Sequence, residues 1–322
     1  MISQTVNQES AVGSENLSPV GRIRRRLANP GSYFRFRGGF SRSLYHKASR
    51  YLHGGTYLSR CIGIEREPVP EALLIPEDRG FVKLSTQEVG DLPLAEAVEE
   101  VRARVARLDI QAEKAASKKP YLLQLFQASD FDRGSAVYKL VTHPTLVGAA
   151  ARYLGAVPLL TYISVWYSPN DERHHGSSQE FHLDHEDFRQ IKGFVFIEDV
   201  DDDCGPFSLI QADKSQEIAR RIGYRMTASS KRLTDERVYG SGTDVQLHRL
   251  TGAAGSLAMV DTSRCFHFGS REGRKPRVLL AFQYMTPFAF VLPWFWQKGD
   301  LLRNFWSEDL NPLEGKVLGA HK

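Results

Sequence analysis

The sequence predicts an α+β protein with a mainly β core, built as a jelly-roll barrel (a double-stranded β-helix) with helices covering it on the N-terminal side. The clearest helical periodicity lies before residue 155. Short runs rich in Val, Ile, Phe and Tyr, separated by Gly, Pro, Asn and Asp clusters, fill much of residues 159–285. Strands that follow helices without regular βα alternation are typical of this class. A barrel of this kind can hold a site within its mouth.

Residues 1–60 form a basic extension. Its first twenty residues are rich in Ser, Gln, Asn and Glu, a composition typical of disorder. The extension holds ten Lys and Arg residues against two Glu residues, a local net charge of +8, whereas the whole chain carries +4. Such an arm could bind phosphate-bearing ligands or nucleic acid, but no nucleic-acid-binding module accompanies it. We therefore expect its aromatic residues to pack on the body and predict no nucleic-acid partner.

We expect residues 61–155 to form a helical region that covers the barrel. An apolar stripe at helical spacing within residues 90–118 marks the buried face of one helix. The stripe consists of Leu94, Val98, Val101, Val105 and Leu108. A second helix is expected from Pro144 to Leu154, because proline suits a first helical turn and Gly155 suits a C-terminal stop.

The catalytic core is expected at residues 156–290, with a polar insert at residues 213–249 and an aromatic tail at residues 291–322. Five runs in the core combine β-branched and aromatic residues between turn signals, which predicts strands. They are residues 159–167, 190–200, 206–211, 255–261 and 277–285. The arginine-rich insert is either a lid over a substrate pocket or a solvated, partly helical excursion. The tail is expected to pack on the barrel, with a homodimer contact as the alternative.

Cysteine usage and hydropathy indicate the compartment. Cys61, Cys204 and Cys265 are widely spaced and give neither a disulfide framework nor a zinc-binding spacing. The first twenty residues lack the apolar segment of a secretory signal. The most apolar stretch, residues 278–296, is interrupted by glutamine and proline. We therefore expect a soluble, cytoplasmic protein that does not enter a membrane.

A His-x-Asp motif at His182 and Asp184 is the segment that points to chemistry. On a strand, residues two apart project from the same face, so an imidazole and a carboxylate point at one spot. Phe181 and Leu183 would face the other way, into packing. His267 would complete a set of two histidines and one carboxylate, which leaves three metal positions open, as non-haem Fe(II) oxygenases require. These residues predict an iron- and 2-oxoglutarate-dependent oxygenase with His182, Asp184 and His267 as metal ligands.

An arginine at the start of the last strong strand supports this prediction. Arg277 lies ten residues after His267, and Leu279 and Ala281 share its side of the strand. A guanidinium group held inside a barrel is costly unless it is paired. The carboxylate of a bound acid is its natural partner, because the two match in bidentate geometry. The alternative is a surface arginine at a strand start.

Residues from about 141 to 287 resemble the phytanoyl-CoA dioxygenase family of Fe(II)/2-oxoglutarate oxygenases. Three motifs followed by Arg277 carry the resemblance. They are FHLD at residues 181–184, GFVFIEDVDDDCGPF at residues 193–207 and VDTSRCFHFG at residues 260–269. Residues 142–155 are also similar to the helix that precedes the barrel in that family.

The resemblance implies a jelly-roll barrel in which His182, Asp184 and His267 hold Fe(II). It also implies that 2-oxoglutarate binds the metal through its keto-acid end, that Arg277 holds its far carboxylate, and that Gln179 contacts this cosubstrate. With O2, such enzymes release succinate and CO2 and by default hydroxylate a small organic substrate. The arginine-rich insert and the basic arm favour an anionic or carrier-linked substrate of the secondary-metabolite type.

Two other functional classes stay open. A cupin-type enzyme with the same barrel and metal would perform non-redox chemistry and would not need Arg277 for a cosubstrate. A non-catalytic binding protein on this fold would be expected to have lost a metal ligand, whereas all three are present. Fold does not decide the substrate, nor whether the outcome is hydroxylation, desaturation or cyclisation.

Overall fold

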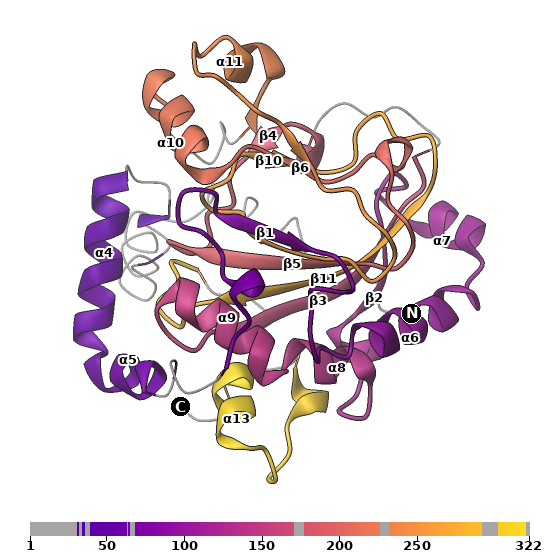
Figure 1. Ribbon diagram of the computed structural model, residues 1–322, viewed down its shortest axis with the longest axis horizontal. Coiled ribbons are helices and arrows are strands. Elements are labelled where there is room, and N and C mark those ends of the chain that lie inside the picture. Colours follow the sequence, from indigo (N-terminus) through magenta and orange to yellow (C-terminus); the bar gives the residue numbers. More distant parts are fainter. Residues whose placement is uncertain are drawn as a thin grey trace, which may run out of the picture.

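The structure, a computed structural model, contains two antiparallel sheets that face each other (Figure 1). The large sheet has six strands, in the order β1 (Phe81–Leu84), β9 (Leu257–Asp261), β5 (Gln190–Phe196), β11 (Arg277–Met285), β3 (Leu159–Ser168) and β2 (Leu123–Gln127). The small sheet has five, in the order β7 (Arg232–Leu233), β4 (Phe181–His182), β10 (His267–Phe268), β6 (Ser208–Leu209) and β8 (His248–Arg249). Two facing antiparallel sheets are the architecture expected of a jelly roll.

The structure describes only part of the chain. The described residues are 31, 34–35, 39–62, 64, 68–170, 177–225, 232–291 and 302–319. The Trp and Phe residues at 294–296 of the predicted aromatic tail, and most of the basic extension before residue 39, lie outside them. None of the helices within the described ranges has the length and apolarity that crossing a membrane requires.

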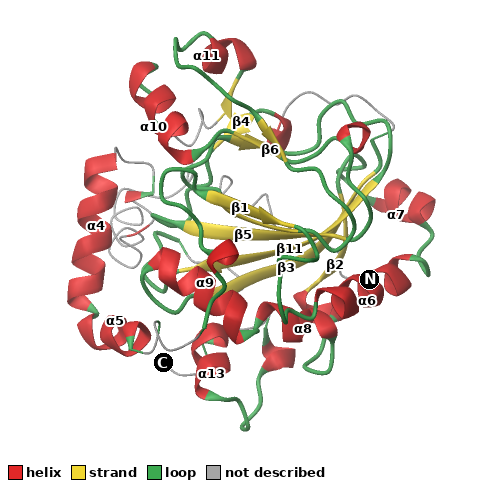
Figure 2. Ribbon diagram, in the orientation of Figure 1, coloured by secondary structure: helices red, strands yellow, loops and turns green. Residues whose placement is uncertain are grey.

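Helices cover the outer faces of both sheets (Figure 2). Against the large sheet lie α6 (Leu94–Val105), α8 (Ala136–Val141), α9 (Pro144–Leu154) and α13 (Pro312–Leu318). Against the small sheet lie α10 (Ala212–Arg221) and α11 (Asp235–Tyr239). At the sides, α4 (Gly39–Leu52) leads into α5 (Gly54–Cys61), and α7 (Ile110–Ala116) contacts β2. Short 3-10 helices are Glu71–Leu73, Ala128–Asp130, Ser177–Gln179, Asp202–Cys204 and Arg303–Phe305.

The two predicted helices differ in outcome. The one that begins at Pro144 is α9, and Gly155 follows it in the left-handed conformation with φ 74°. The one expected within residues 90–118 is interrupted, because α6 ends at Val105 and α7 begins after Asp109. The Asp109 carboxylate accepts hydrogen bonds from two backbone N–H groups in the first turn of α7. Such a side-chain cap starts a new helix by satisfying N–H groups that would otherwise lack a partner.

Each of the five runs predicted to be strands contains one, and residues 277–285 form β11 with those bounds. Strands β1 and β2 were not predicted, and they lie in the region expected to be helical. Strands β7 and β8 come from the insert at residues 213–249. All four are short and pair with strands distant in sequence, so tertiary pairing rather than local propensity makes them. The insert therefore forms part of the barrel wall, with α10 and α11 outside it.

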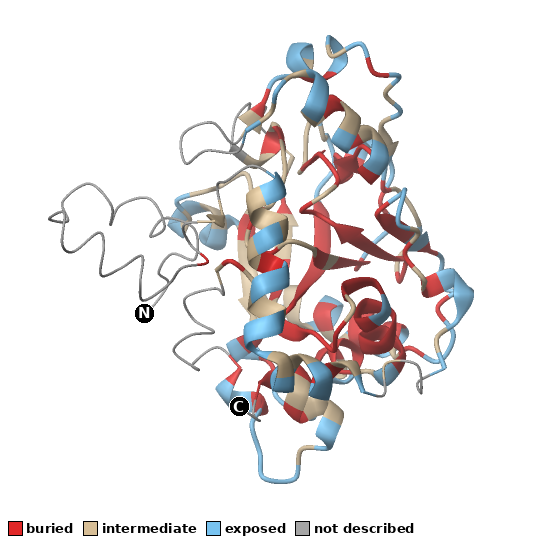
Figure 3. Cartoon of the chain, turned by 90° about the vertical axis from the view of Figure 1, so that its left-hand side faces the viewer, coloured by how far each residue is buried: buried red, intermediate tan, exposed pale blue. Residues whose placement is uncertain are grey.

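Strand β11 of the large sheet is buried along its whole length, and the strands at the centre of Figure 3 are mostly buried. On β11, Val278, Leu280 and Phe282 face the covering helices. Leu279 and Ala281 belong to the layer between the two sheets, together with Leu209 of β6. A strand covered on both sides needs a nearly continuous apolar sequence, which is why this run was prominent in the sequence.

The expectation that the aromatic residues of the basic extension pack on the body is wrong for Phe40 and Tyr51, which are exposed. The arginines of its described part do contact the body. Arg35 forms an ion pair with Glu186 at 3.1 Å, and Arg42 donates to the carbonyl of Asp187 at 2.9 Å. Arg60 is buried and donates to three backbone carbonyls. These arginines therefore serve internal contacts, and the first two hold the loop between β4 and β5.

Candidate metal centre

The register of the small sheet places two histidines side by side. Strands β4 and β10 pair with His182 directly opposite His267, and their ring centroids are 4.3 Å apart. Asp184 follows β4, and its backbone N–H donates to the carbonyl of Thr262 at 2.8 Å. One ligand atom from each of His182, Asp184 and His267 lies within 4.8 Å of the others. The structure thus brings together the three residues that the sequence predicts to hold a metal.

Both imidazoles are oriented by their Nδ1 atoms. Nδ1 of His182 lies 2.8 Å from the carbonyl of Glu180, and Nδ1 of His267 lies 2.9 Å from the carbonyl of Cys265. A carbonyl only accepts, so each Nδ1 carries the proton and each Nε2 keeps a free lone pair. Burial lowers the pKa of both imidazoles, so both are neutral. This is the arrangement of histidines that bind metals through Nε2.

The carboxylate of Asp184 faces both the histidines and a lysine. Its Oδ2 lies 3.9 Å from Nε2 of His267 and 2.7 Å from Nζ of Lys192. The lysine contact is a close ion pair. Burial opposes ionisation of Asp184, but the nearby charge of Lys192 outweighs it, so the pKa of this carboxyl is lowered.

Lys192 is a residue that the sequence analysis missed. It lies on β5 two residues before Phe194, which belongs to the layer between the sheets, and side chains two apart share a face. Its ammonium group is therefore inside the barrel. The available signal was a single lysine within an otherwise apolar strand pattern, on the same side as Phe194 and Phe196.

Arg277 is buried at the start of β11, with 5% of its surface exposed. Its Nη1 donates to the carbonyl of Gly205 at 2.6 Å, while its Nε is buried without a hydrogen-bond partner. No carboxylate among the described residues forms an ion pair with it. Burial lowers its pKa to about 10. The inward arginine expected from the sequence is thus present with an unpaired charge.

Gln179 ends the 3-10 helix before β4. Its Nε2 donates to the carbonyl of Ser270 at 2.9 Å, and its Oε1 is buried without a hydrogen-bond partner. The guanidinium group of Arg271 donates to its backbone carbonyl. These contacts tie Gln179 to the segment that follows β10, and its contact with a cosubstrate stays a prediction.

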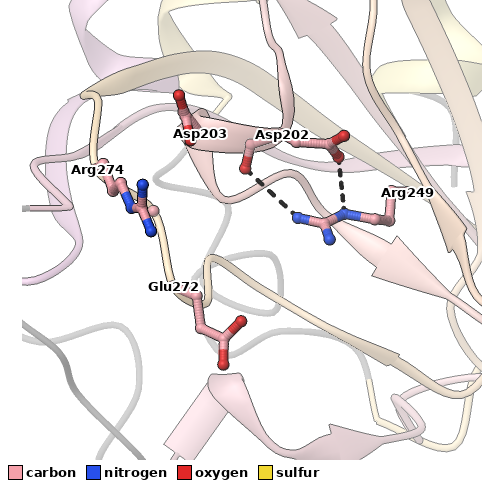
Figure 4. A pocket seen from close by; sticks show the side chains of 6 residues that line it. Asp202, Asp203, Arg249, Glu272 and Arg274 are labelled. Atoms are coloured by element: carbon pink, nitrogen blue, oxygen red, sulfur yellow. Dashed lines mark hydrogen bonds and ion pairs between the residues drawn. The ribbon is translucent and has the colours of Figure 1, made fainter.

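A hollow of about 360 Å³ lies on the surface beside the small sheet (Figure 4). Its lining is polar: Asp202, Asp203, Arg249, Glu272, Gly273 and Arg274. Arg249 forms an ion pair with Asp202 at 2.9 Å, and the neighbouring Asp201 caps the turn by accepting from the N–H of Cys204. None of the three candidate metal ligands lines this hollow, so it is separate from the metal centre.

No protein-family model matches the chain, and no curated protein matches it. Solved structures that match include EctD from S. alaskensis with bound Fe, at 16% identity and TM-score 0.47, covering 71% of this chain and 85% of that chain. Another is the epimerase SnoN in complex with Fe3+, alpha ketoglutarate and nogalamycin RO, at 15% identity and TM-score 0.44, covering 70% of this chain and 84% of that chain. A third is HygX from Streptomyces hygroscopicus with nickel and 2-oxoglutarate bound, at 17% identity and TM-score 0.43, covering 69% of this chain and 89% of that chain.

Proposed function

We propose that this protein is an Fe(II)- and 2-oxoglutarate-dependent oxygenase that acts on a small organic molecule. The observation that carries the proposal is the convergence of His182, Asp184 and His267 inside the barrel. Two neutral imidazoles and one carboxylate suit Fe(II) and leave adjacent coordination positions open. When bound there, iron supplies the oxidation, with O2 and 2-oxoglutarate as cosubstrates and succinate and CO2 as products.

The unpaired charge of Arg277 supports 2-oxoglutarate in particular. A buried guanidinium group without a carboxylate is costly, and the cost is removed when an anion binds. The far carboxylate of 2-oxoglutarate would bind Arg277 in bidentate fashion, while the Gly205 carbonyl keeps the guanidinium group in place. A metal enzyme that does not use 2-oxoglutarate would bind no such carboxylate and would leave the buried charge of Arg277 unexplained.

Aromatic packing would hold the ligands and exclude water. The ring of Phe207 stacks on His267 with centroids 5.2 Å apart, and Phe194 packs on Phe207 at 4.7 Å. An apolar layer around a metal site limits solvent access and fixes ligand orientation. The Lys192 ammonium group keeps Asp184 ionised, and it must share or release Oδ2 when a metal binds.

The finer predictions from the sequence belong to the same proposal. They are membership of the phytanoyl-CoA dioxygenase family, hydroxylation as the reaction, a contact of Gln179 with the cosubstrate, and a cytoplasmic location. The division into an extension, a helical region, a core with an insert and a tail is part of it. The tail is expected to pack on the barrel, with a homodimer contact as the alternative. The motifs quoted above and the intact ligand set support the family and the reaction.

An anaerobic titration of the metal-free protein with Fe(II) and then 2-oxoglutarate tests the proposal. We expect a weak visible charge-transfer band that requires both additions. Asp184→Ala should abolish it, and Arg277→Gln should weaken only the 2-oxoglutarate step. Arg249→Gln, an exposed arginine on β8, is the matched control and should leave the band unchanged.

Each failure has a definite meaning. Metal binding without the band, in the presence of 2-oxoglutarate, would refute the oxygenase and favour non-redox, cupin-type chemistry. Absence of metal binding would refute both enzymes and favour a binding protein on this fold.

A further inference from the structure

One row of side chains crosses the inner face of the small sheet. Residues directly opposite each other on antiparallel strands project from the same face. The printed pairings place His182 opposite both Arg232 and His267. The row therefore runs Arg232, His182, His267, Leu209 and His248. The next pair, Phe181 with Leu233, packs with the outer cluster under α10 and α11.

Arg232 thus projects beside a metal ligand, into the barrel. Its Nη1 is buried and has no hydrogen-bond partner, and no carboxylate among the described residues forms an ion pair with it. The titratable groups that act on its charge are Glu180, Asp184, Tyr121 and Tyr224. Of the two carboxylates, Asp184 is paired with Lys192. Tyr121 lies just before β2 of the large sheet.

The second unpaired guanidinium group, that of Arg277, lies on the other side of the histidines. It binds the carbonyl of Gly205, just before β6. The strand order is β7-β4-β10-β6, so Arg232 on β7 and the Gly205 end of β6 flank the two strands that carry His182 and His267. One cosubstrate bound to the metal and to Arg277 leaves Arg232 without an ion-pair partner among the described residues.

We propose that Arg232 anchors a carboxylate of the organic substrate, so that the substrate is an organic acid held next to the metal on the side opposite Arg277. This inference rests on the proposed function, because the cosubstrate must occupy Arg277. A substrate with a single negative charge fits best. Lys192 is already paired with Asp184, so the guanidinium group of Arg232 is the one positive charge available to the substrate among the residues that the structure describes around the metal. A phosphate dianion would leave a buried charge without compensation.

The competing explanation is a structural role, for example toward Glu180, which lies among the groups that act on Arg232. The two explanations differ in the ligand-free protein. Removing a structural ion pair lowers stability, whereas removing an unpaired, partly buried charge leaves stability unchanged or raises it. Thermal unfolding of Arg232→Gln without ligands therefore gives a readout that does not depend on activity.

The binding test uses the full-length protein loaded with Mn(II) and 2-oxoglutarate under anaerobic conditions. The probes are a panel of carboxylic acids of varied chain length and ring content, each paired with its own primary amide and its phosphate-ester counterpart. We expect some acids, and not their amides, to raise the melting temperature of the wild type. Arg232→Gln should weaken acid binding by at least about tenfold, the usual effect of losing a hydrogen bond to a charged group.

Two further variants complete the test. Arg232→Lys keeps the charge and should retain part of the acid binding, whereas Arg249→Gln on β8 should retain all of it. The inference is overturned if no acid stabilises the wild type, if amides or phosphate esters bind better, or if Arg232→Gln binds the acids as well as the wild type does.

The failure of this inference can be told from the failure of the proposed function. The Fe(II) and 2-oxoglutarate band is measured first on wild type, Arg232→Gln and Arg277→Gln. Absence of the band in the wild type refutes the oxygenase. Loss of the 2-oxoglutarate step in Arg232→Gln, with Arg277→Gln normal, would make Arg232 the cosubstrate residue and overturn the inference alone.

Discussion

The large and small sheets are built in different ways. The large sheet contains strands of up to ten residues, β3 and β11 among them, and helices cover its outer face. Each strand of the small sheet is two residues long, and two of them come from the insert. Both histidine ligands nevertheless lie on the small sheet. The long strands provide the stable frame, and the precise pairing of short strands on that frame creates the site.

The loop that joins the two sheets gives the first way to test this contrast. Asp187, between β4 and β5, is fully buried, and burial raises its pKa to about 7 from an ordinary 3.8. A carboxyl with a raised folded pKa contributes stability that is complete below about pH 3.8 and is lost as the pH rises through about 7. The difference corresponds to roughly 4 kcal/mol at most.

Urea unfolding at a series of pH values measures this effect. The wild type should lose stability between pH 4 and pH 7, and Asp187→Asn should show a flatter profile over that range. Equal slopes in the two proteins would show that Asp187 does not carry the dependence.

Gly193 on β5 tests the packing of the large sheet. A Cβ atom at this position would lie 2.0 Å from Cζ of Phe282 on the neighbouring strand. Gly193→Ala should therefore lower the free energy of unfolding by about 3 kcal/mol, the upper part of the usual range for overpacking. Gly55→Ala in α5, where an added Cβ meets nothing within 4 Å, is the control.

The control should be neutral or slightly stabilising, because alanine favours a helix over glycine. Denaturant unfolding compares the two variants. If Gly193→Ala in a Phe282→Leu background costs as much as it does alone, the ring is not the cause.

Lys192 connects the sheets, and its substitution has the smallest expected effect. Its Nζ is paired with Oδ2 of Asp184, the carboxylate oxygen that faces His267 and that a metal would bind. Lys192→Met removes this competing cation, so metal affinity should rise by about tenfold, equivalent to about 1.4 kcal/mol. Calorimetric titration with Zn(II) measures it, with Lys83→Met, an exposed lysine on β1, as the control. A fall in affinity would instead mean that Lys192 holds Asp184 in its ligating position.

Much of the large sheet and its covering could be predicted from local pattern. The continuous apolar run at residues 277–285 predicted β11. Pro144 and Gly155 predicted where α9 begins and ends. The break between α6 and α7 was missed, because an apolar stripe at helical spacing spans it and the cap at Asp109 is a local competitor. Strands β1, β2, β7, β8 and β10 were missed because two to five residues hold too little pattern.

The sequence by itself determined the set of candidate metal ligands. The spacing of His182 and Asp184 predicts that an imidazole and a carboxylate share one face of a strand, and His267 and Arg277 have the side chains that such a site needs. In the structure β4 ends at His182, and Asp184 follows it. Only the tertiary structure decided what surrounds them. Arg232 lies opposite His182 in the register of β7 and β4, which are far apart in the chain, and Lys192 on the large sheet contacts Asp184, which follows β4 of the small sheet. Such contacts depend on strand register and on the distance between two sheets, which no local pattern encodes.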